Sequence, residues 1–136
     1  MKIDLPDIAS QQRAVFESGT RYAIEQLQKN LNAPRLPAQS IVDENLYPRT
    51  HLVREREGWE APHKDIVDAY FRHFQEHFPE YKTDRKLAEL LGLSSDRRVR
   101  TFKDGSVKVP YGVWRHFLVL TGRVPQEAIP VMAFMG

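Results

Sequence analysis

Apolar residues recur at helical spacing near the start of the chain, from residue 7 to residue 31. Gly19 is a possible break midway through this pattern. Pro34 ends it, because a proline disfavours the helical conformation for the residue before it. The sequence therefore predicts a helix over residues 7–31.

The next segment, residues 32–62, has few periodic apolar positions. It predicts a long loop, with a short strand around Thr50–Glu55. Loops of this length are uncommon inside compact domains, so we expect a boundary between two sub-structures here. Its four prolines are Pro34, Pro37, Pro48 and Pro62.

The helical period returns over residues 63–78 and stops at Pro79. One stripe of this predicted helix is apolar and the other side is polar. The apolar stripe holds Ile66, Val67, Tyr70, Phe71, Phe74 and Phe78, and the polar side holds Lys64, Asp68, Arg72, Gln75 and Glu76.

Three shorter helices are predicted downstream, over Thr83–Leu91, Asp96–Lys103 and Tyr111–Thr121. Thr83 is a suitable N-cap for the first, and Ser94 or Ser95 for the second. Glycines at 92 and 122 are suitable left-handed C-terminal stops. The predicted fold class is all-α, with four to five helices.

Three segments follow from this pattern. Residues 1–62 are an N-terminal helix and a Pro-rich loop, with an accessory or dimerisation role. Residues 63–122 are a helical domain, and residues 123–136 are an apolar tail.

Charge is unevenly distributed. Residues 1–80 carry 10 Lys and Arg against 13 Asp and Glu, a net charge of −3. Residues 81–123 carry 10 Lys and Arg against four Asp and Glu, a net charge of +6. A basic segment in a nearly neutral chain (net charge +2) is typical of polyanion binding, although most charge runs are only solvated faces.

The chain has no cysteine, which excludes disulfides, thiolate zinc sites and a cysteine nucleophile. We find no secretion signal and no apolar run as long as a membrane span. We therefore expect a cytoplasmic protein without membrane contact.

The helices at 63–122, with a tight glycine turn between the second and third, fit the description of a helix-turn-helix. The sequence here resembles the lambda-repressor/Cro-like (XRE-type) DNA-binding domains over roughly residues 64–122. The resemblance rests on Leu87-Ala88-Glu89-Leu90-Leu91-Gly92-Leu93-Ser94, Val99-x-x-Phe102-Lys103-x-Gly105 and Val109-Pro110-Tyr111-x-Val113-Trp114.

One departure concerns the turn. Family members usually place the first buried residue of the recognition helix six positions after the turn glycine, whereas Val99 lies seven after Gly92. Ser94-Ser95-Asp96 therefore contains one extra residue. We expect the insertion to change the angle at which the recognition helix leaves the turn.

The resemblance implies that Val99 and Phe102 are buried and that the rest of their helix faces a major groove. Arginine can donate two hydrogen bonds to guanine O6 and N7. The expected base-reading residues are Arg97, Arg98, Thr101 and Ser95. The expected phosphate contacts, which set register rather than sequence preference, are Lys82, Thr83, Arg85, Arg100, Lys103 and Lys108.

Signals for catalysis are weak. His73-Phe74-Gln75-Glu76-His77 matches the H-x-x-E-H string of inverted zinc proteases, but the chain offers no convincing third ligand. The acidic pairs Asp65/Asp68 and Glu76/Glu80 are typical of solvated helix surfaces. We expect no enzyme activity, no metal, no cofactor and no small-molecule substrate.

The sequence thus predicts a sequence-specific binder of double-stranded DNA, a transcriptional regulator that acts as a repressor by default and binds as a homodimer. The first alternative is a protein-interaction or mobile-element accessory module that keeps the fold without DNA binding. The second is a metal hydrolase.

Overall fold

The computed structural model describes residues 6–136, and within them it contains five α-helices and four short 3-10 helices but no strand. The predicted all-α class is confirmed. Contacts divide the chain into two units. One is residues 38–128, and the other joins α1 (Ile8–Asn30) and its linker up to Pro37 with Ile129–Gly136.

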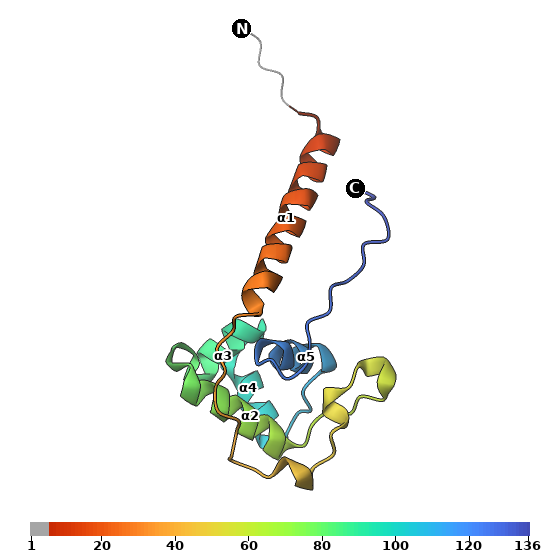
Figure 1. Cartoon of the computed structure of the whole chain (residues 1–136). Helices are drawn as coiled ribbons and strands as arrows, with labels where there is room; N and C mark the ends of the chain where they lie inside the picture. The colour runs from red at the N-terminus through yellow and green to blue at the C-terminus, as the bar shows by residue number, and fades with distance from the viewer. Residues whose placement is uncertain (1–5) are drawn as a thin grey trace. The chain divides into compact units, whose positions relative to one another are not determined.

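The 38–128 unit holds α2 (Lys64–His77), α3 (Asp84–Leu91), α4 (Asp96–Asp104) and α5 (Tyr111–Leu120), gathered around one core (Figure 1). Each helix lies within a residue or two of its predicted range. Local signals explain this agreement.

Thr83 caps α3, because its Oγ1 accepts the backbone N–H of Lys86 at 3.2 Å. Gly92 ends α3 with a φ of +72°, a backbone conformation that residues with a Cβ rarely adopt. Gly105 ends α4 with a φ of +82°, and a Cβ there would lie 2.8 Å from Cδ of Lys64. The two glycines therefore fix where the short helices stop.

Trp114 lies at the centre of the core and is fully buried. Its ring stacks on Tyr70 with centroids 5.6 Å apart, and Phe71 and Phe117 pack against it. The remaining large buried side chains are Ile66, Val67, Phe74, Leu87, Leu91, Val99, Phe102, Val109, Leu118 and Val124.

The segment 38–62 is part of this unit and not a linker. Two 3-10 helices, Thr50–Leu52 and Glu55–Glu57, occupy the region predicted as a strand, so that prediction is wrong. A third, Glu44–Leu46, precedes them. The segment follows an irregular path along the core. Its partly buried apolar side chains, which are spaced irregularly in the sequence, pack against the core: Val42, Tyr47, Leu52 and Trp59.

Polar contacts hold the same segment in place. His51 is only 4% exposed, and its Nδ1 accepts the Nε1–H of Trp114 at 3.2 Å. The Nε1–H of Trp59 donates to the backbone carbonyl of His51 at 3.2 Å. Tyr47 Oη donates to Asp65 Oδ2 at 2.7 Å. The loop is therefore attached to both α2 and α5.

A buried tyrosine adds a further attachment. Tyr70 Oη donates to a carboxylate oxygen of Glu44, and the guanidinium of Arg123 lies 3.9 Å from the centre of the tyrosine ring. Burial and the hydrogen bond to Glu44 raise the pKa of Tyr70. Burial lowers the pKa of Arg123. The loop and the residues after α5 thus meet on one face of α2.

Residues 123–128 also belong to this unit. Val124 is buried, and the carboxylate of Glu127 pairs with Arg54 and lies 3.8 Å from the guanidinium of Arg115. The predicted boundaries at 62/63 and 122/123 therefore differ from the observed ones at 37/38 and 128/129. They differ because segments without a helical period still bury side chains.

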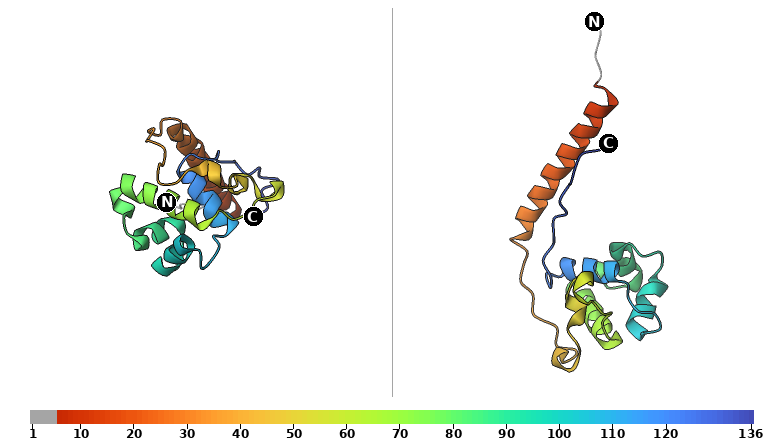
Figure 2. Two further views of the ribbon diagram at one scale, coloured as in Figure 1. Left: turned by 90° about the horizontal axis from the view of Figure 1, so that it is seen from below. Right: turned by 90° about the vertical axis from the view of Figure 1, so that its right-hand side faces the viewer.

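The other unit is built on α1 (Ile8–Asn30), which passes through Gly19 without a break (Figure 2). Asp7 caps it by accepting the backbone N–H of Ser10 at 2.7 Å. None of its residues is buried. From the C-terminal segment, Phe134 packs on Phe16 with ring centroids 5.2 Å apart.

Candidate nucleic-acid interface

The helices α3 and α4 pack against each other through their buried faces. Leu87 and Leu91 of α3 meet Val99 and Phe102 of α4 in the common core. A hydrogen bond of 2.9 Å from the N–H of Leu93 to the carbonyl oxygen of Ala88 closes the turn between them. Helix α4 is thereby held on one side and open to solvent on the other.

Ser95 is the last residue of the turn between α3 and α4. Its backbone is extended, with φ −158° and ψ 158°, and its side chain makes no capping hydrogen bond. Helix α4 consequently begins at Asp96, and Arg97 and Arg98 occupy its first turn. The first turn of a recognition helix is the part that reaches base edges in helix-turn-helix complexes.

Arg97 and Arg98 are both exposed. Among the described residues Arg97 has no ion-pair partner, and the guanidinium of Arg98 lies over the ring of Phe102 at 5.6 Å. Phe102 therefore restricts the direction in which Arg98 extends. Thr101 is partly buried and donates its hydroxyl hydrogen to the carbonyl of Arg98 at 2.8 Å.

Arg100 is engaged within its own helix. Its Nη1 lies 2.9 Å from Oδ2 of Asp96, one turn earlier, and this contact lowers the pKa of Asp96. Both side chains are about half exposed, and exposed pairs of this kind contribute only about 0–1 kcal/mol. A phosphate can compete for Arg100 at little cost.

Lys103 differs from the other predicted phosphate contacts. Its side chain is 17% exposed, and its Nζ lies 2.7 Å from Oδ1 of Asp84 and 2.8 Å from Oε1 of Gln75. These bonds join the end of α4 to the start of α3 and to the last turn of α2. Lys103 therefore fixes the three helices relative to one another, and its ammonium is not directed at solvent.

Lys82, Thr83 and Arg85 lie at or before the N-terminal end of α3, and all three are exposed. The carbonyl of Lys82 accepts from Gln75 Nε2 at 3.4 Å, so this end of α3 adjoins the Lys103 contacts. Arg85 and Ser95 line one shallow hollow beside the turn.

Lys108 is exposed as well, on the connection between α4 and α5. It lines a different hollow, of about 400 Å³, together with Lys64, His63 and His51. The predicted phosphate contacts are thus not all gathered in one place. The structure groups those around the start of α3 and separates Lys108 from them.

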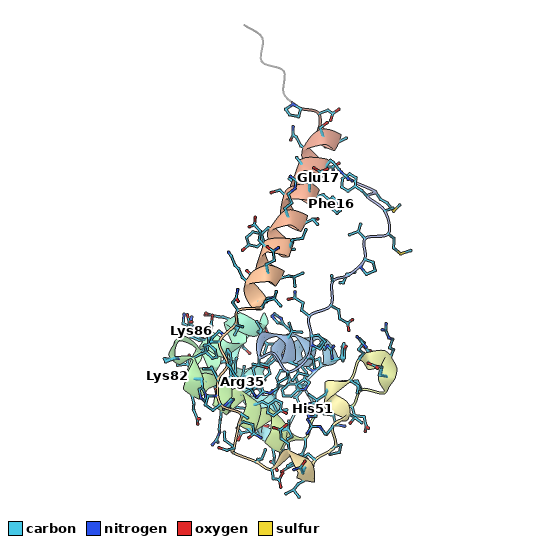
Figure 3. The ribbon with its side chains drawn as sticks, in the orientation of Figure 1. Phe16, Glu17, Arg35, His51, Lys82 and Lys86 are labelled. Carbon is cyan, nitrogen blue, oxygen red and sulfur yellow. The ribbon has the colours of Figure 1, made fainter. Side chains whose placement is uncertain are left out.

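Two residues with a bearing on this surface were not predicted. Lys86 is exposed on the first turn of α3 and is labelled close to Lys82 in Figure 3. Lys86 belongs to the basic segment 81–123, and the excess of Lys and Arg in that segment is the sequence signal that could have identified it. Gln75 was expected on the polar side of its helix but is only 8% exposed, and nothing in its local sequence indicates its role.

The histidines of the H-x-x-E-H string also come together. The rings of His73 and His77 lie with centroids 4.5 Å apart, and a ring nitrogen of His77 lies 2.8 Å from the carbonyl oxygen of His73. Within residues 6–136 no group of three or more His, Asp or Glu side chains is arranged to hold a metal ion.

No helix in the described part of the chain is both long enough and apolar enough to cross a membrane. A scan of family models, a search of characterised proteins and a search of solved structures each found no match to this chain.

Proposed function

We propose that this protein binds double-stranded DNA in a sequence-specific manner and regulates transcription. The observation that carries the proposal is α4 itself. It buries Val99 and Phe102 on one side and presents Arg97 and Arg98 to solvent from its first turn. This is the arrangement that a helix needs in order to enter a major groove while held by its scaffold.

The proposed roles follow from exposure and pairing. Arg97 and Arg98 read base edges, and Thr101 and Ser95 flank them. Phosphates are bound by Lys82, Thr83, Arg85, Lys86, Arg100 and Lys108. Lys103 is left out of this set, because Asp84 and Gln75 occupy its ammonium.

The resemblance to XRE-type domains supports the same assignment through the residues that pack α3 against α4. Proteins of this architecture bind as dimers to half-sites one helical turn apart, roughly 34 Å. We propose a homodimer that represses by occlusion, since occlusion needs only the bound protein. In this proposal the protein is not an enzyme and needs no cofactor.

The proposal is tested by selecting bound fragments from random duplex DNA and titrating the best binder with salt. Suppose that the five Lys and Arg side chains of this set each neutralise one phosphate per copy. The slope of log K against log salt is then about −9 for a dimer. We expect an enriched half-site and a slope of this order. Recovery of unrelated fragments without enrichment would contradict sequence-specific reading.

The protein-interaction alternative is favoured by one observation, the exposed apolar side chains of α1 and the C-terminal segment, among them Val15, Tyr22 and Met132. That alternative predicts no DNA binding at any salt concentration. The titration therefore separates the two functions.

A further inference from the structure

The hollow that Lys108 lines is built from two stretches of the 38–128 unit, residues 48–67 and 102–109. We call it the Lys64 hollow. Its volume of about 400 Å³ lies within the range of small-molecule sites, roughly 300–1,000 Å³. It also exceeds the roughly 150 Å³ of a cavity that holds a benzene molecule. The space is therefore large enough for a ring that carries a polar group.

The floor of the Lys64 hollow is apolar. Val67, Phe102 and Val109 line it, and each is at most 2% exposed. Pro48 and Pro62 add apolar surface from the loop before α2. A surface of this kind cannot replace the water around an inorganic ion, whereas it can bury the hydrocarbon part of an organic one. The floor therefore favours a ligand with an apolar body.

The edge of the hollow is positively charged. Lys64 and Lys108 line it with exposed side chains. Neither forms an ion pair with any residue that the structure describes. Glu60 is the acidic residue of the lining, so the carboxylate and the two ammonium groups leave a net charge of +1. A single carboxylate on the ligand matches this charge, whereas a dianion would place unmatched negative charge beside Glu60.

Lys64 is held in place by its packing. A Cβ on Gly105 would lie 2.8 Å from Cδ of Lys64, so the lysine stem lies directly against the glycine that ends α4. The carboxylate of Asp104 accepts the backbone N–H of Ser106 at 2.8 Å and also its hydroxyl, and it forms no ion pair with Lys64. A ligand therefore finds this ammonium unpaired and does not have to order the stem that carries it.

His51, labelled in Figure 3, supplies a further donor. An indole N–H can only donate, so Nδ1 of His51, which accepts it from Trp114, carries no proton. Burial lowers the pKa of His51 to about 4, and the neutral ring then carries its proton on Nε2. No hydrogen bond of the described residues uses this Nε2–H, and no sealed side-chain nitrogen or oxygen among them lacks a partner. The Nε2–H is therefore not sealed, and the Lys64 hollow is the space that His51 lines.

We propose that the Lys64 hollow binds a small organic monocarboxylate as a non-covalent ligand. The apolar body of the ligand packs on Val67, Phe102 and Val109, and its carboxylate pairs with the ammonium groups of Lys64 and Lys108. The ligand is bound and not converted. This inference goes beyond the proposed DNA binding and does not rest on it.

The first test titrates the protein, without DNA, with four probes at neutral pH and constant ionic strength. Benzoate and hexanoate join an apolar body to one carboxylate. Benzamide keeps the shape of benzoate without its charge, and inorganic phosphate has charge without an apolar body. Binding is followed by the backbone amide signals of the protein in nuclear magnetic resonance spectra.

We expect both carboxylates to bind with dissociation constants below about 2 mM, and benzamide and phosphate to bind at least about tenfold more weakly than benzoate. The amide signals of Gly105 and Val109 should shift, whereas that of Leu93, beside a different hollow, should not. Weaker binding of both carboxylates, or benzamide or phosphate within tenfold of benzoate, would overturn the proposal. Shifts at Leu93 without shifts at Gly105 would overturn it as well.

The second test compares two variants that lose the same charge. Lys64→Met keeps an unbranched stem against Gly105 and removes the ammonium. Lys86→Met makes the same change on α3, outside the hollow. We expect Lys64→Met to raise the dissociation constant for benzoate at least about fivefold, and Lys86→Met to change it less than about twofold. Both lysines are exposed, so both variants should fold. Equal affinities in the two variants would overturn the proposal.

The two proposals fail separately. Lys108 belongs to both, but Lys64 is not among the proposed DNA contacts, so Lys64→Met reports on the ligand alone. A protein that binds benzoate but no DNA would contradict only the proposed function. A protein that binds DNA but neither carboxylate would contradict only this inference.

Discussion

The ammonium of Lys103 lies 2.7 Å from the carboxylate of Asp84, and this ion pair joins the two helices of the proposed DNA-binding unit. Both side chains are mostly buried, at 17% and 23% exposed. Gln75 completes the contact from α2. The geometry between α3 and α4 therefore depends on a polar contact as well as on the apolar core.

Lys103→Met should reduce the free energy of unfolding by about 1–3 kcal/mol, because it removes the ion-pair partner of Asp84 and leaves Oε1 of Gln75 without its donor in a mostly buried site. The salt slope of DNA binding should stay unchanged. Arg85→Ala is the matched variant: it should leave stability within about 0.5 kcal/mol and reduce the slope by about 0.9 per copy. Urea unfolding and binding titrations give both quantities. The reverse pattern would show that Lys103 is a phosphate contact.

Arg97→Ala should relax discrimination between half-site variants by about 1–3 kcal/mol at one base pair, because the loss of a bidentate contact affects one base. Arg72→Ala, on the exposed side of α2, serves as the control and should leave discrimination unchanged. Binding is measured on a panel of half-sites that differ at single positions. An equal loss on every sequence would show that Arg97 contacts only phosphate.

His51 should make stability fall as the solution becomes acidic. Burial lowers its pKa from 6.5 to about 4. Between these values the unfolded chain binds a proton at this residue and the folded protein does not. The free energy of unfolding should therefore decrease as pH falls from 6.5 to 4, by about 3 kcal/mol in total.

The measurement is chemical denaturation at several pH values, with His51→Gln as the comparison. Glutamine can still accept the hydrogen bond from Trp114 but does not titrate. Subtracting its pH profile removes the contribution of the carboxylates, among them Glu44, whose pKa is lowered. Burial raises that pKa, but hydrogen bonds from Tyr70 and Gln39 outweigh the effect. Equal pH profiles would show that the pKa of His51 is the same in the folded and unfolded states.

Trp114→Ala and Phe102→Ala should each destabilise the 38–128 unit by roughly 3–5 kcal/mol, since both rings are buried. Leu120→Ala is a control on the same helix as Trp114, and its side chain is exposed. Thermal unfolding gives the comparison. An unchanged melting temperature for either aromatic variant would contradict this core.

The structural features that the sequence predicts well are those controlled by residues close together in the chain. Thr83 and Gly92 act on their own backbone or on residues a few positions away, so the ends of α3 followed from local signals. The pairing of Val99 with Phe102 followed from helical spacing. These features set most of the scaffold of the candidate site.

The remaining features depend on contacts between distant positions. Gln75 meets Lys103 across 28 positions, and Trp114 meets His51 across 63. Hydrophobic periodicity does not reveal contacts between distant positions. The sequence therefore predicts Gln75 on the solvent side of its helix and Lys103 as a DNA contact. The sequence predicts a boundary within residues 32–62 because the buried side chains of this segment follow no regular spacing.

The attachment of His51 to Trp114 has a consequence for how this unit can be inherited. A recombination event that joined residues 63–122 to another protein would leave the indole N–H of Trp114 without its acceptor and uncover the side of the core that the loop protects. Exchange at Pro37 keeps both intact. The heritable module is therefore the helical domain together with its loop, and the four helices alone would arrive in a new protein incomplete.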